Sequence, residues 1–289
     1  QVHLLVSAME STAQYWRPVW EALERYWQPR RRTREGAGPM SGRLHLAQAQ
    51  SNRGARGRKK DFPDAERLVK RLAAQGVAIA GCVSQIGEVR WEGEAFDPAV
   101  IEGNPVRCPD PATAQRMEEA ILAARKAGDS LGGIITVVAV GVPAGGGEPY
   151  YARLDSDLAS AMMGIHAVKG VEIGAGFRAA SMRGSQHNDP FDFAGGKVVP
   201  RTNHAGGILG GISSGAPIVV RFAVKPTSSI LLEQETVSVT GERRAVRVEG
   251  RHDPCVAPRA VPIGEAMMAV VLADHWRLSL GSRVDGGRG

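Results

Sequence analysis

The sequence predicts an α+β protein, because helical patterns, strand patterns and β-hairpin signals all occur along the chain. Residues 218–224 place every second apolar side chain on one face of a strand. Residues 236–240 and 245–249 alternate on either side of Gly241 and Glu242, which is typical of a hairpin. Strands that arrive in hairpins as well as between helices favour antiparallel sheets over a doubly wound parallel sheet.

The first elements are predicted from their end signals. A helix over residues 63–75 ends at a glycine, and a strand follows over 77–86. Asp110 is placed to cap a helix that begins at Pro111 and ends at Gly128. Two helices therefore flank the first predicted strand.

The later elements are predicted from their apolar periodicity. The longest apolar run, residues 134–142, is predicted to be a buried strand, and extended structure is expected again over 166–177. A helix between them is marked by a stripe of apolar side chains: Leu154, Leu158, Met162 and Ile165. A last helix over about 262–280 is expected to turn four apolar side chains inward: Ile263, Met267, Val270 and Val271.

Composition excludes several classes of protein. No apolar run approaches the length of a membrane span, and the N-terminus lacks a secretory signal pattern. The three cysteines, Cys82, Cys108 and Cys255, have no paired spacing, which argues against a disulfide scaffold or a zinc site. We therefore expect a soluble cytoplasmic protein with no metal centre.

The net charge of +6 comes from a single segment. Residues 30–60 hold ten basic side chains and one acidic side chain, so the rest of the chain sums to −3. This segment lacks periodicity, and residues 1–29 before it hold three of the five tryptophans. We predict an unmatched leader over 1–60, separate from a folded domain over 61–289. The alternative is a protein that binds nucleic acid through the basic arm, although that arm lacks interleaved aromatic residues.

A glycine- and serine-rich stretch over residues 203–217 precedes the strand at 218–224, and a Lys-Pro-Thr-Ser-Ser turn follows it. Glycines remove the Cβ obstruction, and their free N–H groups can bind an anion. We expect the loop and the turn to form a phosphate or cofactor cradle. The alternative is a tight strand connection, since the loop matches no dinucleotide or Walker fingerprint.

Three further segments hold unusual polar residues. His166 and Lys169 follow a predicted helix end, where basic side chains also occur as ordinary caps. The string MRGSQHND is either a functional loop or a solvated turn. The string RHDPC after the hairpin is suited to anion binding and proton transfer, or is a surface turn with a local ion pair.

Taken together, these segments resemble the chorismate synthase family. The resemblance rests on four strings in the family's order, and it covers about residues 61–275. The strings are VPAGGGEPYYARLDSDLASAMMGIHAVKGVEIGAGF, MRGSQHND, NHAGGILGGISSGAPIVVRFAVKPTSSI and GRHDPCVAPRAVPIGEAMMAVVLADH.

The resemblance implies a lyase that converts 5-enolpyruvylshikimate 3-phosphate to chorismate in the shikimate pathway of aromatic amino acid biosynthesis. The reaction is a 1,4-anti elimination of phosphate that requires reduced FMN, and the family's fold is a homotetrameric β-α-β sandwich of antiparallel sheets. By the resemblance, Asp253 is catalytic. The implied flavin contacts are His166, Ala167, Gly210, Lys225, Pro226, Thr227, Ser228, Ser229 and Arg251.

The family's N-terminal motifs are absent from this sequence. These motifs are Gly-Glu-Ser-His-Gly, Arg-Pro-Gly-His-Ala-Asp and Gly-Gly-Arg-Ser-Ser, and the two catalytic histidines of the family belong to them. The resemblance therefore implies an N-terminally incomplete domain, so the alternative to an active enzyme is a catalytically impaired relative. We expect residues 1–60 to arise from a shifted reading frame or a mis-assigned start.

Overall fold

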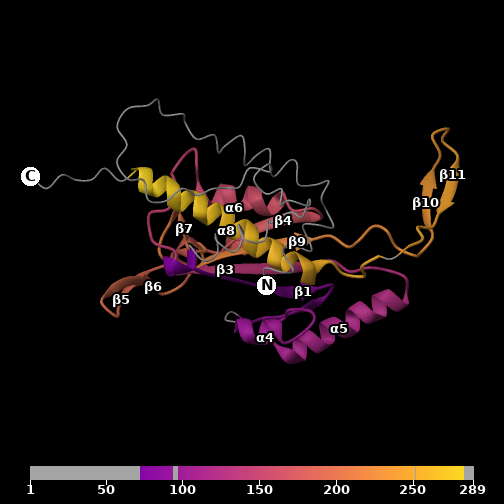
Figure 1. The fold of residues 1–289 in the computed structure, drawn as a ribbon, viewed down its shortest axis with the longest axis horizontal. Coiled ribbons are helices and arrows are strands. Elements are labelled where there is room, and N and C mark those ends of the chain that lie inside the picture. Colours follow the sequence, from indigo (N-terminus) through magenta and orange to yellow (C-terminus); the bar gives the residue numbers. More distant parts are fainter. Residues whose placement is uncertain (1–71, 94–96, 251, 283–289) are drawn as a thin grey trace, which may run out of the picture. The chain divides into compact units, whose positions relative to one another are not determined.

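The computed structural model describes residues 72–93, 97–250 and 252–282, which belong to one unit beginning at Leu72. The predicted leader, most of the first predicted helix and Arg251 lie outside these residues. Figure 1 shows the described elements, whose helices and strands confirm the α+β class.

The centre of the described unit is a five-stranded antiparallel sheet with the strand order β2-β1-β3-β9-β4. Its strands are β1 (Ala78–Ile86), β2 (Val89–Arg90), β3 (Gly133–Val140), β4 (Val168–Ile173) and β9 (Ile218–Val224). β9 lies between β3 and β4, although β4 precedes it in the chain. The described residues form no second sheet of this size, so they supply one sheet layer of the expected sandwich.

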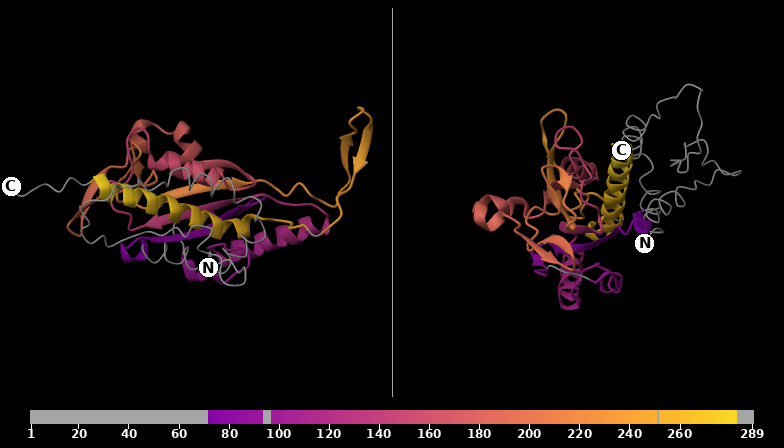
Figure 2. Two further views of the ribbon diagram at one scale, coloured as in Figure 1. Left: turned by 45° about the horizontal axis from the view of Figure 1, so that its top comes forward. Right: turned by 90° about the vertical axis from the view of Figure 1, so that its left-hand side faces the viewer.

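Two helices, α6 (Leu154–Met163) and α8 (Ala257–Ser282), pack against each other and against the sheet. α8 contacts β1 and β3, and α6 contacts β4 and β9. Two other helices, α4 (Pro98–Glu102) and α5 (Pro111–Lys126), contact β1, and α5 also contacts β2. In Figures 1 and 2, α4 and α5 lie on the opposite side of the sheet from α6 and α8.

The core forms where β9 and β3 turn their alternating apolar side chains toward α6 and α8. The predicted inner face of β9 is confirmed, since its four alternate side chains are at most 4% exposed. Gly264 of α8 lies directly over Phe222, because a Cβ there would come within 2.7 Å of the ring. The close approach of helix and sheet therefore depends on a glycine in the helix. The apolar side chains of this core include Ile135, Val137, Leu154, Leu158, Met162, Ile218, Val220, Phe222 and Val224.

The end signals of α5 act as predicted. The Asp110 side chain accepts a hydrogen bond from the N–H of Thr113 at 2.7 Å, and Pro111 occupies the first helical position. Gly128 adopts φ of +75° just after the helix, in the left-handed region that favours glycine. The sequence-based start and end of this helix are confirmed.

Two other helix predictions are wrong in detail. α8 begins at Ala257, so Pro262 lies inside the helix and not at its start. Packing outweighs the tendency of proline to interrupt a helix, because Ala257 and Val261, which precede Pro262, are fully buried against the sheet. The inner face also differs. Ile263, Met267, Val270 and Val271 are half-buried, and the buried stripe contains Val261, Met268, Leu272 and His275.

The remaining strands form three two-stranded ribbons. The predicted hairpin around Gly241 and Glu242 is confirmed, but its strands, β10 (Gln234–Val237) and β11 (Arg243–Val246), begin two residues earlier and are one residue shorter than expected. The other ribbons are β5 (Phe191–Ala194) with β6 (Lys197–Pro200), and β7 (Ile208–Leu209) with β8 (Ile212–Ser213). The expected extended segment at 166–177 contains β4 and then gives way to a 3₁₀ helix, η1 (Gly176–Ser181). A short helix, α7 (Gly184–His187), follows within MRGSQHND.

The cysteines are buried and unpaired, as their spacing predicted. Burial raises the pKa of the Cys82 thiol to about 12, so this side chain behaves as a small apolar group. Of the helices in the described residues, none has the length and apolar character needed to cross a membrane.

Candidate functional site

The predicted flavin segments meet at the end of β9 where Val224 lies. Val224 pairs with Val168 at the start of β4 and with Gly133 at the start of β3. Antiparallel pairing therefore brings the end of one strand beside the beginnings of two others. This register places residues 166–167 and 225–229 together, although the chain separates them by more than fifty positions.

Two hydrogen bonds hold this junction. The N–H of Lys225 donates to the Ala167 carbonyl at 2.9 Å. The Ser130 hydroxyl donates to the Thr227 carbonyl at 2.7 Å, which ties the Lys-Pro-Thr-Ser-Ser turn to the connection between α5 and β3. Ala167 adopts φ of +69°, a strained conformation for a residue with a side chain. Strain of this kind is often found at ligand sites, although it also occurs in tight turns.

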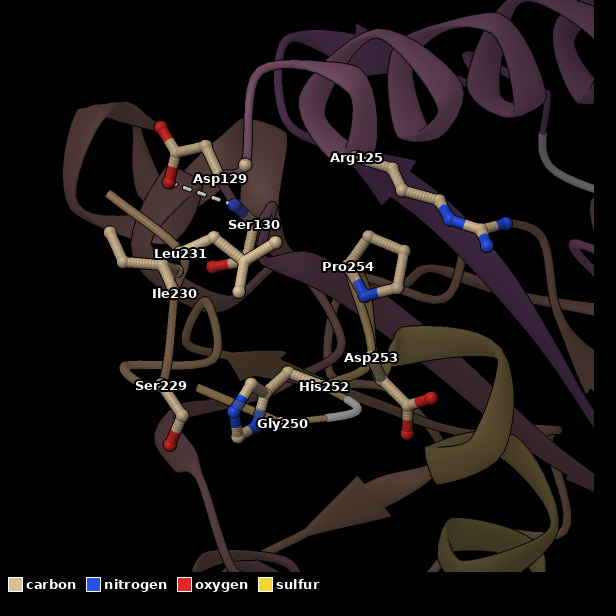
Figure 3. Close-up of a pocket in the computed structure, with 11 residues that line it drawn as sticks. Arg125, Asp129, Ser130, Ser229, Ile230, Leu231, Gly250, His252, Asp253 and Pro254 are labelled. Atoms are coloured by element: carbon tan, nitrogen blue, oxygen red, sulfur yellow. Dashed lines mark hydrogen bonds between the residues drawn. The ribbon is translucent and has the colours of Figure 1, made fainter. Parts of the chain in front are cut away.

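A cleft of about 220 Å³ lies beside this junction, between the end of α5 and the two stems of the β10–β11 hairpin (Figure 3). Of the residues predicted from sequence, Ser229 and Asp253 line it. The other lining residues are Arg125, Gly128, Asp129, Ser130, Ile230, Leu231, Gly250, His252 and Pro254.

Two buried polar atoms at this junction have no hydrogen-bond partner among the described residues. They are the Oγ1 atom of Thr227 and the Nε2 atom of His252. Buried polar groups in folded proteins are nearly always hydrogen-bonded, because an unmade bond costs about 1–3 kcal/mol. Both atoms are fully buried, so a bound molecule would reach them only if the junction rearranged.

The carboxylates of the cleft are held by neighbouring groups. Asp253 Oδ2 lies 2.6 Å from Arg259 Nη1, on the first turn of α8. Asp129 accepts a hydrogen bond from the Ser130 N–H at 2.8 Å, drawn as a dashed line in Figure 3. Sequence reasoning missed Arg259 and the segment 128–130, which become neighbours of the site only through the fold.

The other predicted flavin residues lie around the same end of β9 or outside the description. His166 and Lys225 are exposed, and Pro226 and Ser228 belong to the exposed turn that follows β9. Arg251 lies outside the described residues, so its side chain is not placed.

Gly210 lies elsewhere, which corrects the expectation of a single cradle made by the glycine-rich loop and the turn after β9. It sits between β7 and β8, next to Gly211, whose carbonyl accepts the N–H of Leu154 at the start of α6. The loop adjoins the beginning of β9, and the turn follows its end. Seven strand residues separate them, or about 20 Å.

Asp189 stabilises the MRGSQHND loop through hydrogen bonds. Asp189 accepts hydrogen bonds from the Thr202 hydroxyl and from the N–H groups of His204 and Ala205, at 2.7–2.9 Å. Burial opposes the shift, but these hydrogen bonds hold the pKa of Asp189 below its usual value. The loop is therefore an ordered support for the glycine-rich segment, and it does not line the cleft.

Comparison with known proteins identifies the family. The family model described as chorismate synthase matches residues 65–277. The chain belongs to the chorismate synthase family.

Individual relatives agree with this assignment. A chorismate synthase from Gluconacetobacter diazotrophicus is 53% identical over 209 residues, which cover 72% of this chain and 58% of the relative. One from Methanosarcina mazei is 53% identical, covering 71% of this chain and 57% of the relative. A solved structure titled "Crystal Structure of Chorismate Synthase" matches with a TM-score of 0.64 and 32% identity, covering 75% of this chain and 62% of that one. The chain thus spans somewhat more than half the length of these relatives.

Proposed function

We propose that this chain carries the cofactor-binding side of a lyase that eliminates phosphate from 5-enolpyruvylshikimate 3-phosphate to give chorismate, with reduced FMN. The observation that carries the proposal is the convergence of residues 166–167, 225–229 and 252–253 at one end of β9. All three segments lie within the region that matches the family model.

The residues at this end of β9 fit a flavin phosphate and ring. Lys225 supplies an exposed cation, and Ser228 is an exposed hydroxyl-bearing residue of the same turn. When bound, reduced FMN would supply an electron-rich ring to the elimination without net oxidation or reduction. The residues proposed to hold it are His166, Ala167, Lys225, Pro226, Thr227, Ser228, Ser229 and Arg251.

Asp253 is proposed to exchange a proton. Its Oδ2 atom is fixed by Arg259 at 2.6 Å, which leaves Oδ1 as the atom on which a proton would be held. Departure of phosphate develops negative charge, and fixed cations such as Lys225 would stabilise that charge.

The proposal extends to assembly and location. We infer a cytoplasmic homotetramer, in line with the family resemblance. A contact from Gly210 to this flavin would then come from another copy of the chain, because Gly210 lies at the other end of β9. In that case Gly210→Arg would weaken flavin binding only at protein concentrations at which the chain is oligomeric.

Residues 1–60 are proposed to be separate from the flavin-binding domain. Deletion of these residues would then leave flavin affinity unchanged. A loss of affinity on deletion would show that the segment contributes to the site.

The test is an anaerobic incubation of the chain with reduced FMN and 5-enolpyruvylshikimate 3-phosphate, with chorismate formation followed by absorbance and flavin binding measured separately. Turnover would support the full activity. Flavin binding without turnover would support the cofactor side alone and indicate an impaired relative. Absence of flavin binding would overturn the proposal.

A further inference from the structure

The ribbon of β5 and β6 exposes an apolar face. Phe193 lies opposite Val198 in its register, and Phe191, two residues earlier on the same strand, shares their face. Phe191, Phe193 and Val198 are 55%, 71% and 66% exposed. Among the described elements, β5 and β6 make extensive contact only with each other, and Figure 1 shows them at one end of the unit. A two-stranded ribbon is marginally stable in water, so exposed aromatic residues on it indicate an interaction surface.

Hydrogen bonds hold the base of this ribbon beside the 3₁₀ helix η1. Asp189, just before β5, accepts the N–H groups of His204 and Ala205 at 2.8 and 2.9 Å. The His204 carbonyl in turn accepts the N–H of Ala175, the residue before η1, at 2.7 Å. The ribbon, hereafter the arm (residues 191–200), is therefore fixed at its base next to η1.

An apolar groove lies between η1 and β4, the last strand of the five-stranded sheet. A cavity of about 150 Å³ is enough to bind a benzene ring, so the groove, with a volume of about 310 Å³, has room for an aromatic side chain. Its lining residues are Val171, Glu172, Ile173, Gly176, Phe177 and Ala180.

Glu172 is the one charged residue among those that line the groove, and its charge is already paired. One carboxylate oxygen accepts the Phe177 N–H and the other accepts Nε of Arg221, both at 3.1 Å. Arg221 also donates to the Gly174 carbonyl at 2.8 Å. Phe177, by contrast, is 80% exposed. The free surface of the groove is therefore apolar, and it suits an apolar occupant.

The exposed areas favour a second copy of this chain as that occupant. A whole phenylalanine buries about 150–250 Å², so the exposed parts of Phe191, Phe193 and Val198 amount to roughly 300 Å². Stable interfaces bury about 800 Å² on each partner and rarely less than about 600 Å². An arm in the groove of an unrelated protein would fall short of that area. Two copies related by a twofold axis would engage arm and groove on both chains, which doubles the area to roughly 600 Å² per chain.

We propose that two copies of this chain exchange arms, with Phe191 and Phe193 of each copy packed in the groove between β4 and η1 of the other copy. Such a contact is isologous, because both copies use the same arm and the same groove. The base of the arm adjoins η1 within each chain, so one twofold axis beside η1 serves both contacts. This inference assigns a contact surface to the proposed assembly, and it requires no bound flavin.

Sedimentation velocity of the full chain over a range of concentrations measures the dissociation constant of the oligomer. Phe193→Thr keeps a strand-forming residue and removes the ring from both symmetric contacts, so the dissociation constant should rise at least about tenfold. Phe177→Ser, in the groove, should cause a rise of similar size. Val239→Thr is the matched control and should leave the dissociation constant unchanged, because Val239 is a fully exposed apolar residue between β10 and β11.

A photoreactive phenylalanine analogue at position 193 tests the contact without removing an aromatic ring. Irradiation of a mixture of isotope-labelled and unlabelled chains should join this position to residues 171–180 of the other copy. Crosslinks confined to other segments, or to a single chain, would overturn the proposal.

Three other outcomes contradict the arm exchange. A wild-type dissociation constant in Phe193→Thr or in Phe177→Ser would show that the copies meet elsewhere, and it would leave the proposed homotetramer intact. An equal loss in Val239→Thr would indicate general adhesion of exposed apolar residues. A wild-type chain that is monomeric at every concentration would overturn this contact and the homotetramer together, while flavin binding, measured separately, would still decide the proposed cofactor site.

Discussion

The two ends of β9 differ in the residues that surround them. At its beginning, glycines let one backbone lie on another, and Asn203 bridges them by donating to the Pro217 carbonyl and accepting from the Gly207 N–H, both at 2.8 Å. At its end, Lys225 and hydroxyl-bearing residues replace the glycines, and the buried Thr227 hydroxyl has no partner among the described residues.

In the glycine-rich loop, Gly207 allows two backbone segments to pack closely. At Gly207 a Cβ would lie 2.5 Å from the Pro217 carbonyl oxygen, so that glycine is needed for packing. Unsatisfied polar atoms occur at the other end, beside the cleft. Gly207 therefore marks close backbone contact, whereas the buried Thr227 and His252 atoms without a partner among the described residues lie at the other end of β9.

The largest expected effect is a loss of stability at the beginning of β9, where two backbone segments pack closely. Gly207→Ala places a methyl group against backbone at φ of +79°, so the free energy of unfolding should fall by about 3 kcal/mol or more. Gly210→Ala is the control, because a Cβ at Gly210 meets nothing within 4 Å, and its left-handed backbone alone should cost about 1–2 kcal/mol. Chemical denaturation of both variants measures the difference, and equal losses would contradict the packing role.

The next largest expected effect is a pH dependence of the free energy of unfolding, caused by Glu265 on α8. Glu265 on α8 accepts the Gly81 N–H at 2.7 Å, and its burial raises its pKa from 4.5 to about 7. Between these values the folded state binds more protons than the unfolded state, so stability should fall as pH rises from about 4.5 to about 7. The fall should be on the order of 2 kcal/mol, because each pKa unit corresponds to about 1.4 kcal/mol and residual solvation reduces the effect.

Glu265→Gln should flatten that part of the curve of unfolding free energy against pH, since glutamine does not titrate. Denaturation of the wild-type chain and the variant at several pH values between 4.5 and 7 provides the measurement. The same slope in both proteins would rule out Glu265 as its source.

A smaller effect should appear only at the ligand end. Lys225→Ala removes an exposed cation, so flavin mononucleotide affinity should fall about tenfold while the melting temperature stays near that of the wild type. Arg201→Ala removes another exposed cation, on the segment after β6, and should change neither quantity. Titration calorimetry and thermal melting distinguish the two variants; a similar affinity loss in both would indicate general charge attraction.

The smallest effect concerns the ion pair at the start of α8. Arg259→Gln should change the free energy of unfolding by less than about 0.5 kcal/mol, because the Arg259 side chain is 62% exposed and exposed pairs are weak. A larger loss, measured by chemical denaturation, would show that the pair stabilises the fold. That result would weaken the proposal that it serves to orient Asp253.

Local sequence was enough to predict much of the fold and two residues that line the candidate cleft, Ser229 and Asp253. The cap at Asp110, the stop at Gly128 and the alternating face of β9 follow from interactions over a few residues. The inner face of α8 was wrong, because β1 and β3 determine which stripe of that helix is buried. The prediction that the glycine-rich loop and the turn after β9 form one cradle was also wrong within one chain. The seven residues of β9 separate the loop from the turn, although both are close to that strand in the sequence.

The sequence by itself determined the family and the α+β class, since these depend on residue order and local periodicity. Only the tertiary structure decided which segments meet. The antiparallel register of β9 with β3 and β4 gathers the turn after Lys225 beside the start of β4 and the end of α5, and it leaves Gly210 far away. Such a register depends on packing between distant residues, so no local pattern encodes it.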